Sequence, residues 1–142
     1  GSGNMFRLAL FDMLQGHNND LWAGVDSRGF LFAAGLAGVN GGGVLMIRKK
    51  GKLPPPVSSI PINTEYSYET LEIQSNTGEH RKSVVLVDDV LATGNTLESS
   101  YELLVNNGYD VLGVVVLIDL LYLHDKDFTV GGHKVHSVIQ YK

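Results

Sequence analysis

The 142-residue chain contains no cysteine, which excludes disulfide bonds and thiol catalysis and is compatible with a cytoplasmic protein. No apolar run approaches the ~18 residues of a membrane helix, so no membrane partner is expected. Positive charge is also scarce, because eleven Lys and Arg residues stand against fifteen Asp and Glu residues and the formal net charge is −4. Nucleic-acid-binding domains are usually basic, so we expect no nucleic-acid partner either.

What remains is ordinary for a globular protein: hydrophobic residues make up 44% of the chain, and its length suits one domain, residues 1–142. Apolar segments alternate with helical patterns, which predicts an α/β fold with a central, mostly parallel sheet flanked by helices on both faces. The predicted strands span 21–25, 44–47, 71–74, 84–87, 111–118 and 135–141, and the predicted helices span 5–15, 30–37 and 96–106. Residues 52–69 contain three successive prolines and are expected to form a long excursion that is extended in part.

The most informative stretch is 84–96, where four apolar residues lead into Asp88 and Asp89 and then into a loop of small residues before a helix. Backbone N–H groups at a helix start bind phosphate without help from Lys or Arg. Gly94 permits a positive φ, and Asn95 tolerates one. Paired carboxylates suit sugar hydroxyls, directly or through Mg²⁺. The alternative is a solvated acidic turn followed by a helix N-cap.

Two further segments have a composition that suits a diphosphate. Residues 26–29 (Asp-Ser-Arg-Gly) lie between a predicted strand and a predicted helix, and Arg28 offers a planar fork of donors. The alternative is a turn with an exposed arginine. Residues 48–52 contain four cations, a pattern that is usually a solvated face. The five histidines have no spacing typical of metal ligands, and we expect them at surface or edge positions.

Residues 84–96 resemble the 5-phosphoribosyl 1-diphosphate (PRPP) motif of the type I phosphoribosyltransferases. Three more stretches narrow the resemblance to the adenine phosphoribosyltransferases: residues 24–32, residues 47–54, and Glu65-Tyr66 together with residues 71–74. The resemblance runs from roughly Phe6 to Tyr141. It implies the type I phosphoribosyltransferase fold with a long flexible catalytic loop. Members of the family usually carry an N-terminal hood over the base, which this chain is expected to lack or to have in truncated form.

The resemblance also implies roles for individual residues. The 5′-phosphate would lie in the loop Ala92, Thr93, Gly94, Asn95 and Thr96, and the ribose hydroxyls would face Asp88 and Asp89. Pyrophosphate would be held by Asp26, Ser27 and Arg28, with a cis peptide between the first two, and by Arg48 and Lys52 reaching across a homodimer. Glu65 would act as the acid/base residue and, with Arg28, form the catalytic pair. Leu120 would pack against the adenine.

The reaction implied is adenine plus PRPP giving AMP and pyrophosphate, which is purine salvage in the cytoplasm. Mg²⁺ would be bound with PRPP, without a dedicated set of protein ligands. Two alternatives remain open at this point. The chain could be a regulatory module that binds PRPP or a nucleotide with little transfer activity, or a transferase for another 6-substituted purine.

Overall fold

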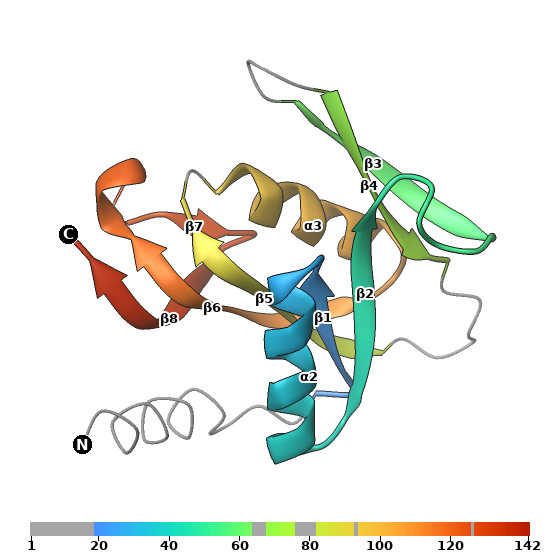
Figure 1. Ribbon diagram of the computed structural model, residues 1–142, viewed down its shortest axis with the longest axis horizontal. Coiled ribbons are helices and arrows are strands. Elements are labelled where there is room, and N and C mark those ends of the chain that lie inside the picture. The colour runs from blue at the N-terminus through green and yellow to red at the C-terminus, as the bar shows by residue number, and fades with distance from the viewer. Residues whose placement is uncertain (1–18, 64–67, 76–81, 93, 126) are drawn as a thin grey trace.

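The chain folds around one twisted sheet, described here from a computed structural model for residues 19–63, 68–75, 82–92, 94–125 and 127–142 (Figure 1). Eight strands lie in the order β3-β4-β2-β1-β5-β6-β8-β7. In chain order the elements are β1 (Leu21–Val25), α2 (Arg28–Asn40), β2 (Gly43–Lys49), β3 (Val57–Asn63), β4 (Tyr68–Gln74), β5 (Ser83–Leu91), α3 (Asn95–Asn106), β6 (Asp110–Leu120), the 3₁₀ turn η1 (Leu121–Leu123), β7 (Thr129–Val130) and β8 (His133–Tyr141).

The centre of the sheet is parallel and its two edges are antiparallel. Strands β2, β1, β5, β6 and β8 run parallel to one another. The hairpin β3–β4 joins one edge through β2, and β7 joins the other edge through β8. The expected mostly parallel α/β sheet is therefore confirmed in the part that carries the acidic pair.

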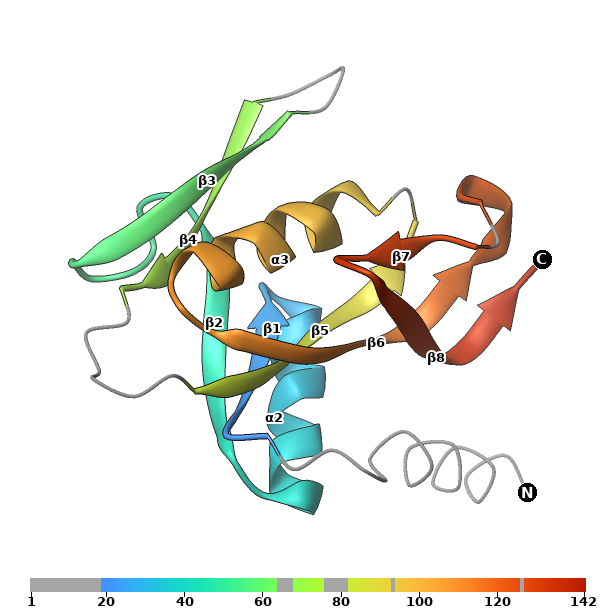
Figure 2. The ribbon, with the colours of Figure 1, turned by 180° about the vertical axis from the view of Figure 1, so that it is seen from behind.

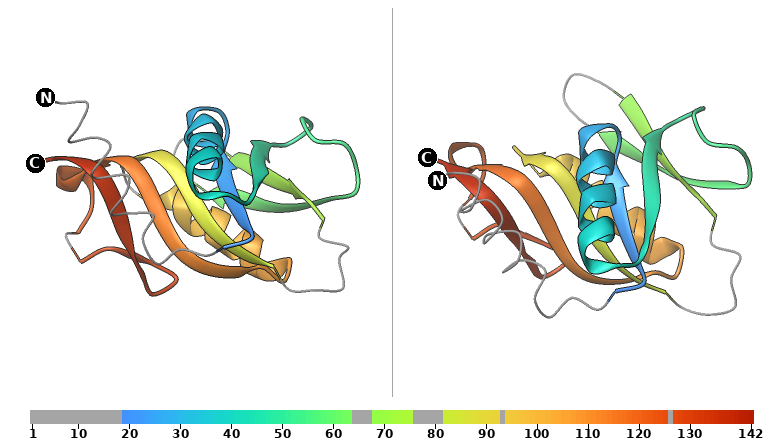
Figure 3. Two further views of the ribbon diagram at one scale, coloured as in Figure 1. Left: turned by 90° about the horizontal axis from the view of Figure 1, so that it is seen from below. Right: turned by 60° about the horizontal axis from the view of Figure 1, so that its bottom comes forward.

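Helices α2 and α3 cover opposite faces of the sheet (Figures 2 and 3). Strand β5 supplies both of the resulting cores, because neighbouring side chains of a strand point to opposite faces. Val85 and Val87 belong to the core beneath α2, whereas Val84 and Leu86 belong to the other core together with Leu104 of α3. All five of these side chains are essentially inaccessible to solvent. The two cores hold β5 rigidly beneath the candidate site.

The expected excursion over residues 52–69 is extended in its second half, and the extended part is regular strand. Residues 57–63 and 68–74 form the antiparallel hairpin β3–β4, which projects beyond α3 (Figure 1). Ile60 and Ile62 are buried with the core on the α3 side. Pro61 between them is tolerated because β3 is the outermost strand, where a missing N–H breaks no ladder on the open side.

Other element boundaries differ less. Helix α2 begins at Arg28 and ends at Asn40, longer than expected at both ends, and β5 continues to Leu91. The acidic pair thus lies inside β5 and not beyond its end. The expected helix over residues 5–15 lies outside the described residues. None of the helices in the described ranges is long and apolar enough to cross a membrane.

Candidate active site

The acidic pair on β5 meets the first turn of α2. Asp88 is only 9% exposed. A Cβ atom on Gly29 would lie 3.1 Å from both Cα and Oδ1 of Asp88, so the absence of a side chain at Gly29 permits this close approach. The Nε atom of Arg28 lies 2.9 Å from Oδ2 of Asp89. The structure therefore brings together the two segments that were expected to handle the ribose and the pyrophosphate.

The two carboxylates of the pair differ in their environment. Burial raises the pKa of Asp88 to about 7, and the negative charge of Asp89 adds to the increase. The Asp89 N–H donates to Oδ1 of Asp88 at 2.8 Å, and this bond opposes the increase, as does the positive charge of Arg28. Near neutral pH Asp88 is therefore divided between its acid and carboxylate forms, so it can donate or accept a hydrogen bond at a sugar hydroxyl.

The loop between β5 and α3 encloses a small cavity of about 70 Å³. Gly94 is the N-cap residue of α3 and has φ 92°, as expected for the loop. Asn95 was expected to tolerate the same conformation, but it is the first helical residue, and no described residue other than glycine has a positive φ. Thr93 lies outside the described residues. Residues lining this cavity are Asp88, Val90, Leu91, Ala92, Gly94, Asn95, Thr96 and Leu97.

This cavity has the features of an anion site. The first N–H groups of an α-helix have no acceptor within the helix, and the helix dipole places partial positive charge there. Ala92 and Thr96 are partly buried, and Gly94 is buried, so the backbone of the loop forms much of the wall. The arrangement can bind a phosphate group through main-chain amides.

A larger cleft of about 270 Å³ lies beside the acidic pair. It is lined by Val25, Asp26, Ile47, Lys49, Ile62, Glu69, Leu71, Asp88, Asp89 and Thr96. Its floor is apolar, and its rim carries charges of both signs. The peptide bond between Asp26 and Ser27 is cis, as the family resemblance implied. Because Asp88 and Thr96 also line the smaller cavity between β5 and α3, the two spaces share a wall.

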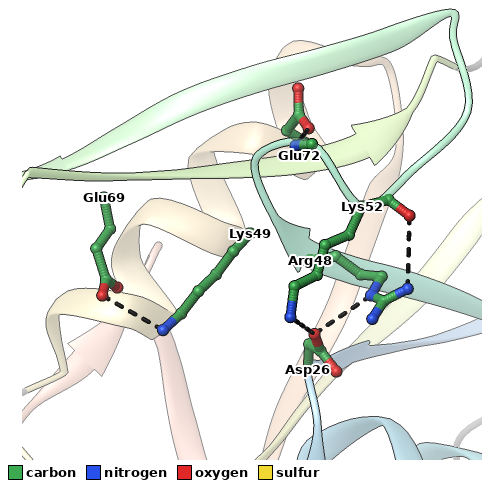
Figure 4. Close-up of polar contacts among 7 residues, drawn as sticks. Asp26, Arg48, Lys49, Lys52, Glu69 and Glu72 are labelled. Carbon is green, nitrogen blue, oxygen red and sulfur yellow. Dashed lines mark hydrogen bonds and ion pairs between the residues drawn. The ribbon is translucent and has the colours of Figure 1, made fainter.

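The basic segment 48–52 lies around Asp26 (Figure 4). The Arg48 Nε atom donates to Oδ2 of Asp26 at 3.2 Å, and the Lys52 Nζ atom lies 3.9 Å from the same oxygen. Glu72, which is buried, accepts the Gly51 N–H at 2.7 Å and so fixes the turn between Arg48 and Lys52. The structure thus gathers three of the expected pyrophosphate residues at one point.

Two residues of the cleft were missed by the sequence analysis. Lys49 lies 3.3 Å from Glu69 through its Nζ atom, and both line the cleft (Figure 4). Strand alternation places Lys49 on the same face as Ile47, whereas Arg48 lines a separate groove of about 370 Å³ before its guanidinium turns to Asp26. The period of two was visible in the sequence, but which face would meet the cleft was not.

Leu120 and His124 do not line the cleft. Leu120 is the last residue of β6, is partly buried and pairs in register with Tyr141, and it lines neither of the two cavities described above. Glu65 and Tyr66 lie outside the described residues. His124, expected at a surface or an edge, has a side chain that is only 5% exposed.

Metal binding by side chains alone finds little support in this part of the chain. The described ranges hold no group of three or more His, Cys, Asp or Glu residues that could bind a metal ion. Of the two carboxylates of the acidic pair, Asp88 takes up a proton near neutral pH and Asp89 is paired with Arg28.

Comparison with known proteins gives a consistent result. The family model for the phosphoribosyl transferase domain matches residues 7–127. The adenine phosphoribosyltransferase of Bdellovibrio bacteriovorus is 43% identical over 122 residues, which cover 86% of this chain and 70% of that protein. The crystal structure of adenine phosphoribosyltransferase from Thermoanaerobacter pseudethanolicus is similar with a TM-score of 0.84 at 35% identity, covering 96% of this chain and 80% of that one. The Giardia lamblia enzyme complexed with 9-deazaadenine is similar with a TM-score of 0.84 at 30% identity, covering 96% and 78%.

Proposed function

The chain belongs to the adenine phosphoribosyltransferase family, and we propose that it transfers the phosphoribosyl group of PRPP to N9 of adenine, giving AMP and pyrophosphate. The relatives and the solved structures reported above carry that enzyme's name. The observation that carries the proposal is the shared wall between the phosphate cavity and the charged cleft, formed by Asp88 and Thr96. A phosphorylated sugar extending from one space into the other would pass directly over the acidic pair.

The 5′-phosphate binds in the loop Ala92, Thr93, Gly94, Asn95 and Thr96 under this proposal. Asp88 and Asp89 then face the ribose hydroxyls, with Asp88 able to act as donor or acceptor because of its raised pKa. The adjacent cleft of about 270 Å³ takes the diphosphate. Leu120, assigned to the base side from the resemblance, remains a prediction.

Departure of pyrophosphate is the step that the basic residues assist. As the bond to C1′ loosens, negative charge grows on the leaving group, and preorganised cations stabilise it. Arg28 lies at the entrance to the acidic pair, and Arg48 and Lys52 lie around Asp26 of the cis-peptide loop. Asp26 is the carboxylate partner of Arg48 and Lys52, and a bound diphosphate, which carries more charge than one carboxylate, would replace it as their partner.

Attack on C1′ needs a dry and ordered site. The hairpin β3–β4 supplies Ile62, Glu69 and Leu71 to the wall of the cleft, and it leads into the segment that contains Glu65. We assign Glu65, which lies outside the described residues, the acid/base role at the purine. Positioning and electrostatics account for most of the catalysis, because no covalent intermediate with the protein is required.

Three further features belong to the proposal. Mg²⁺, bound with PRPP, would neutralise diphosphate charge, and Asp89 is the residue best placed to contact its water shell or the ribose hydroxyls. A homodimer would let Arg48 and Lys52 act at the neighbouring subunit's pyrophosphate as well as near Asp26. A cytoplasmic location agrees with the lack of cysteine.

The test is PRPP-dependent AMP formation by the purified chain, compared with its Asp89→Asn variant. We expect activity in the unmodified chain and a loss of at least about a hundredfold in the variant, comparable with the removal of a preorganised charged group. Asp110→Asn, at the amino end of β6 and exposed, is the matched control and should retain full activity. Equal activity in the Asp89 variant and the unmodified chain would reject these roles.

Calorimetry separates the alternatives. Binding of PRPP with no adenine binding and no turnover would favour a regulatory module. Turnover of another 6-substituted purine at a rate above that of adenine would keep the reaction class and change the substrate.

A further inference from the structure

The phosphate loop is backed by an aromatic ring from a distant part of the chain. A Cβ atom on Gly94 would overlap Cζ of Phe128 and lie within 3 Å of two other ring atoms. The Phe128 ring therefore lies directly against the backbone of the N-cap residue of α3. Phe128 also packs against the core on the α3 side. The position of this ring limits how far the loop at Gly94 can move.

Phe128 is in turn held by His124. The two rings have centroids 5.4 Å apart and are inclined by 52°. The Phe128 N–H donates to the carbonyl oxygen of Asp125 at 3.0 Å. The Nδ1 atom of His124 lies 2.7 Å from that same carbonyl oxygen. His124 thus contacts both the ring of Phe128 and the turn on which Phe128 is mounted.

The other ring nitrogen of His124 contacts the end of β6. Its Nε2 atom lies 2.6 Å from Oδ1 of Asp119, and both side chains are about 5% exposed. Carbonyl and carboxylate oxygens only accept hydrogen bonds, so each ring nitrogen must carry a proton to satisfy both contacts. Only the imidazolium form does so. The neutral ring loses one of the two bonds.

We propose that His124 is a positioning residue which, in its doubly protonated form, holds Phe128 against Gly94 and so shapes the loop that grips the sugar's terminal phosphate. The linkage runs from Asp119 through His124 and the Asp125 carbonyl to Phe128 and the loop. It rests on the proposed role of residues 92–96 as the phosphate site. It adds a residue from the turn that follows β6, and this residue controls the geometry of that site.

The linkage makes phosphate binding dependent on pH. Burial by itself lowers the pKa of His124, but the hydrogen bonds to Asp119 and to the Asp125 carbonyl, with the charges of both aspartates, raise it above its ordinary value. The ring that packs against it, Phe128, carries no charge. Because the histidine pKa is raised, both hydrogen bonds of His124 are present at lower pH. One of them is lost as pH rises through the folded-state pKa.

Two substitutions divide the linkage into its halves. His124→Gln can place an amide N–H near the Nε2 position and keep the contact with Asp119, whereas His124→Asn can keep the contact with the Asp125 carbonyl. Phe128→Leu removes the ring but keeps apolar bulk, so it is less disruptive to folding than an alanine at this position would be. His136→Gln, on the exposed side of β8, is the matched control.

The first measurement needs no ligand. In the ¹⁵N-labelled chain, the Gly94 amide resonance should shift with pH at the midpoint of the His124 ring titration. The shift should disappear in His124→Gln and persist in His136→Gln. A Gly94 amide resonance whose chemical shift does not change with the His124 titration would overturn the proposal, whether or not the protein has transferase activity.

The second measurement is the affinity for ribose 5-phosphate and for adenosine at pH 6.5 and pH 8.5. Loss of one charge-assisted hydrogen bond corresponds to about tenfold in an equilibrium constant. We therefore expect Phe128→Leu and His124→Gln to weaken ribose 5-phosphate about tenfold at pH 6.5 and to leave adenosine within about twofold. The ratio of the variant's affinity to that of the unmodified chain cancels the ligand's own ionisation. For His124→Gln this ratio should approach one as pH rises through the midpoint of the His124 titration measured by NMR. Equal losses for both ligands would show a general structural role and reject the proposal. If ribose 5-phosphate failed to bind the unmodified chain, the phosphate-site assignment would fail. The pH dependence of the Gly94 amide resonance would still test whether His124 positions Phe128 and the loop.

Discussion

Replacement of Asp88 by asparagine is expected to stabilise the fold at neutral and alkaline pH while it weakens ribose binding. Asp88 is 9% exposed and lies between the first turn of α2 and Asp89. Asparagine has nearly the same shape, and its carbonyl oxygen can accept the Asp89 N–H that Oδ1 now accepts at 2.8 Å. The variant therefore removes a buried charge without removing its hydrogen bond.

The magnitude follows from the raised pKa. Burial lifts the pKa of Asp88 from an ordinary 3.8 to about 7, and a tenfold change in a protonation constant corresponds to about 1.4 kcal/mol. Between these two pH values the folded state binds more protons than the unfolded state, so the free energy of unfolding falls as pH rises and levels off above about 7. The full difference is about 4 kcal/mol, which is the upper limit of the gain expected for the asparagine variant at pH 8.

Urea unfolding at pH 5, 6, 7 and 8 measures this prediction. The difference between the two proteins should grow across that range, because other titrating groups cancel between them. Glu102→Gln, exposed on α3, serves as the control and should leave the pH dependence unchanged. Parallel curves for the asparagine variant and the unmodified chain would refute a buried, proton-binding Asp88. A gain in stability with a loss of PRPP affinity would identify Asp88 as a residue kept for function.

Gly94→Ala should destabilise the fold by about 1–3 kcal/mol and abolish phosphate binding, since φ is 92° and the new Cβ would meet the Phe128 ring. Gly35→Ala, in the exposed middle of α2 with no atom within 4 Å of the new Cβ, should instead stabilise by up to about 1 kcal/mol; thermal unfolding distinguishes the two, and a tolerated Gly94→Ala would contradict the described loop. Arg28→Lys should change stability by no more than about 1 kcal/mol, because the ion pair with Asp89 is largely exposed on the arginine side. Its kcat/KM for PRPP should nonetheless fall by about tenfold or more through loss of the planar donor fork, and unchanged steady-state kinetics would remove Arg28 from the pyrophosphate site.

The phosphate loop and the acidic pair could be located from the sequence because their information is local. An apolar strand, two carboxylates, small residues and a helix follow one another within residues 84–96, so the chain order is also the spatial order. Gly94 with its positive φ agrees with that analysis. The cis peptide at Asp26 was available only through the resemblance, since nothing in those side chains requires it.

The misses have physical causes that a linear sequence does not display. Pro61 lowers the apparent strand propensity of residues 57–63, and only the edge position of β3 makes it acceptable. Lys49 and Arg48 differ by one residue, and a single step in a strand decides which face each side chain joins. The His124 side chain contacts Asp119, five positions earlier, across the 3₁₀ turn η1, and histidine composition alone gives no sign of that turn.

Strand β5 lies between two cores and between two parallel neighbours, so its amides can exchange with solvent only when the whole sheet opens. Hydrogen exchange at Leu86 and Val87 should therefore report global unfolding even in the absence of ligand. The backbone beneath the acidic pair is already ordered before substrate arrives. Binding energy from a phosphorylated sugar is then not spent on ordering this backbone and can serve the reaction instead.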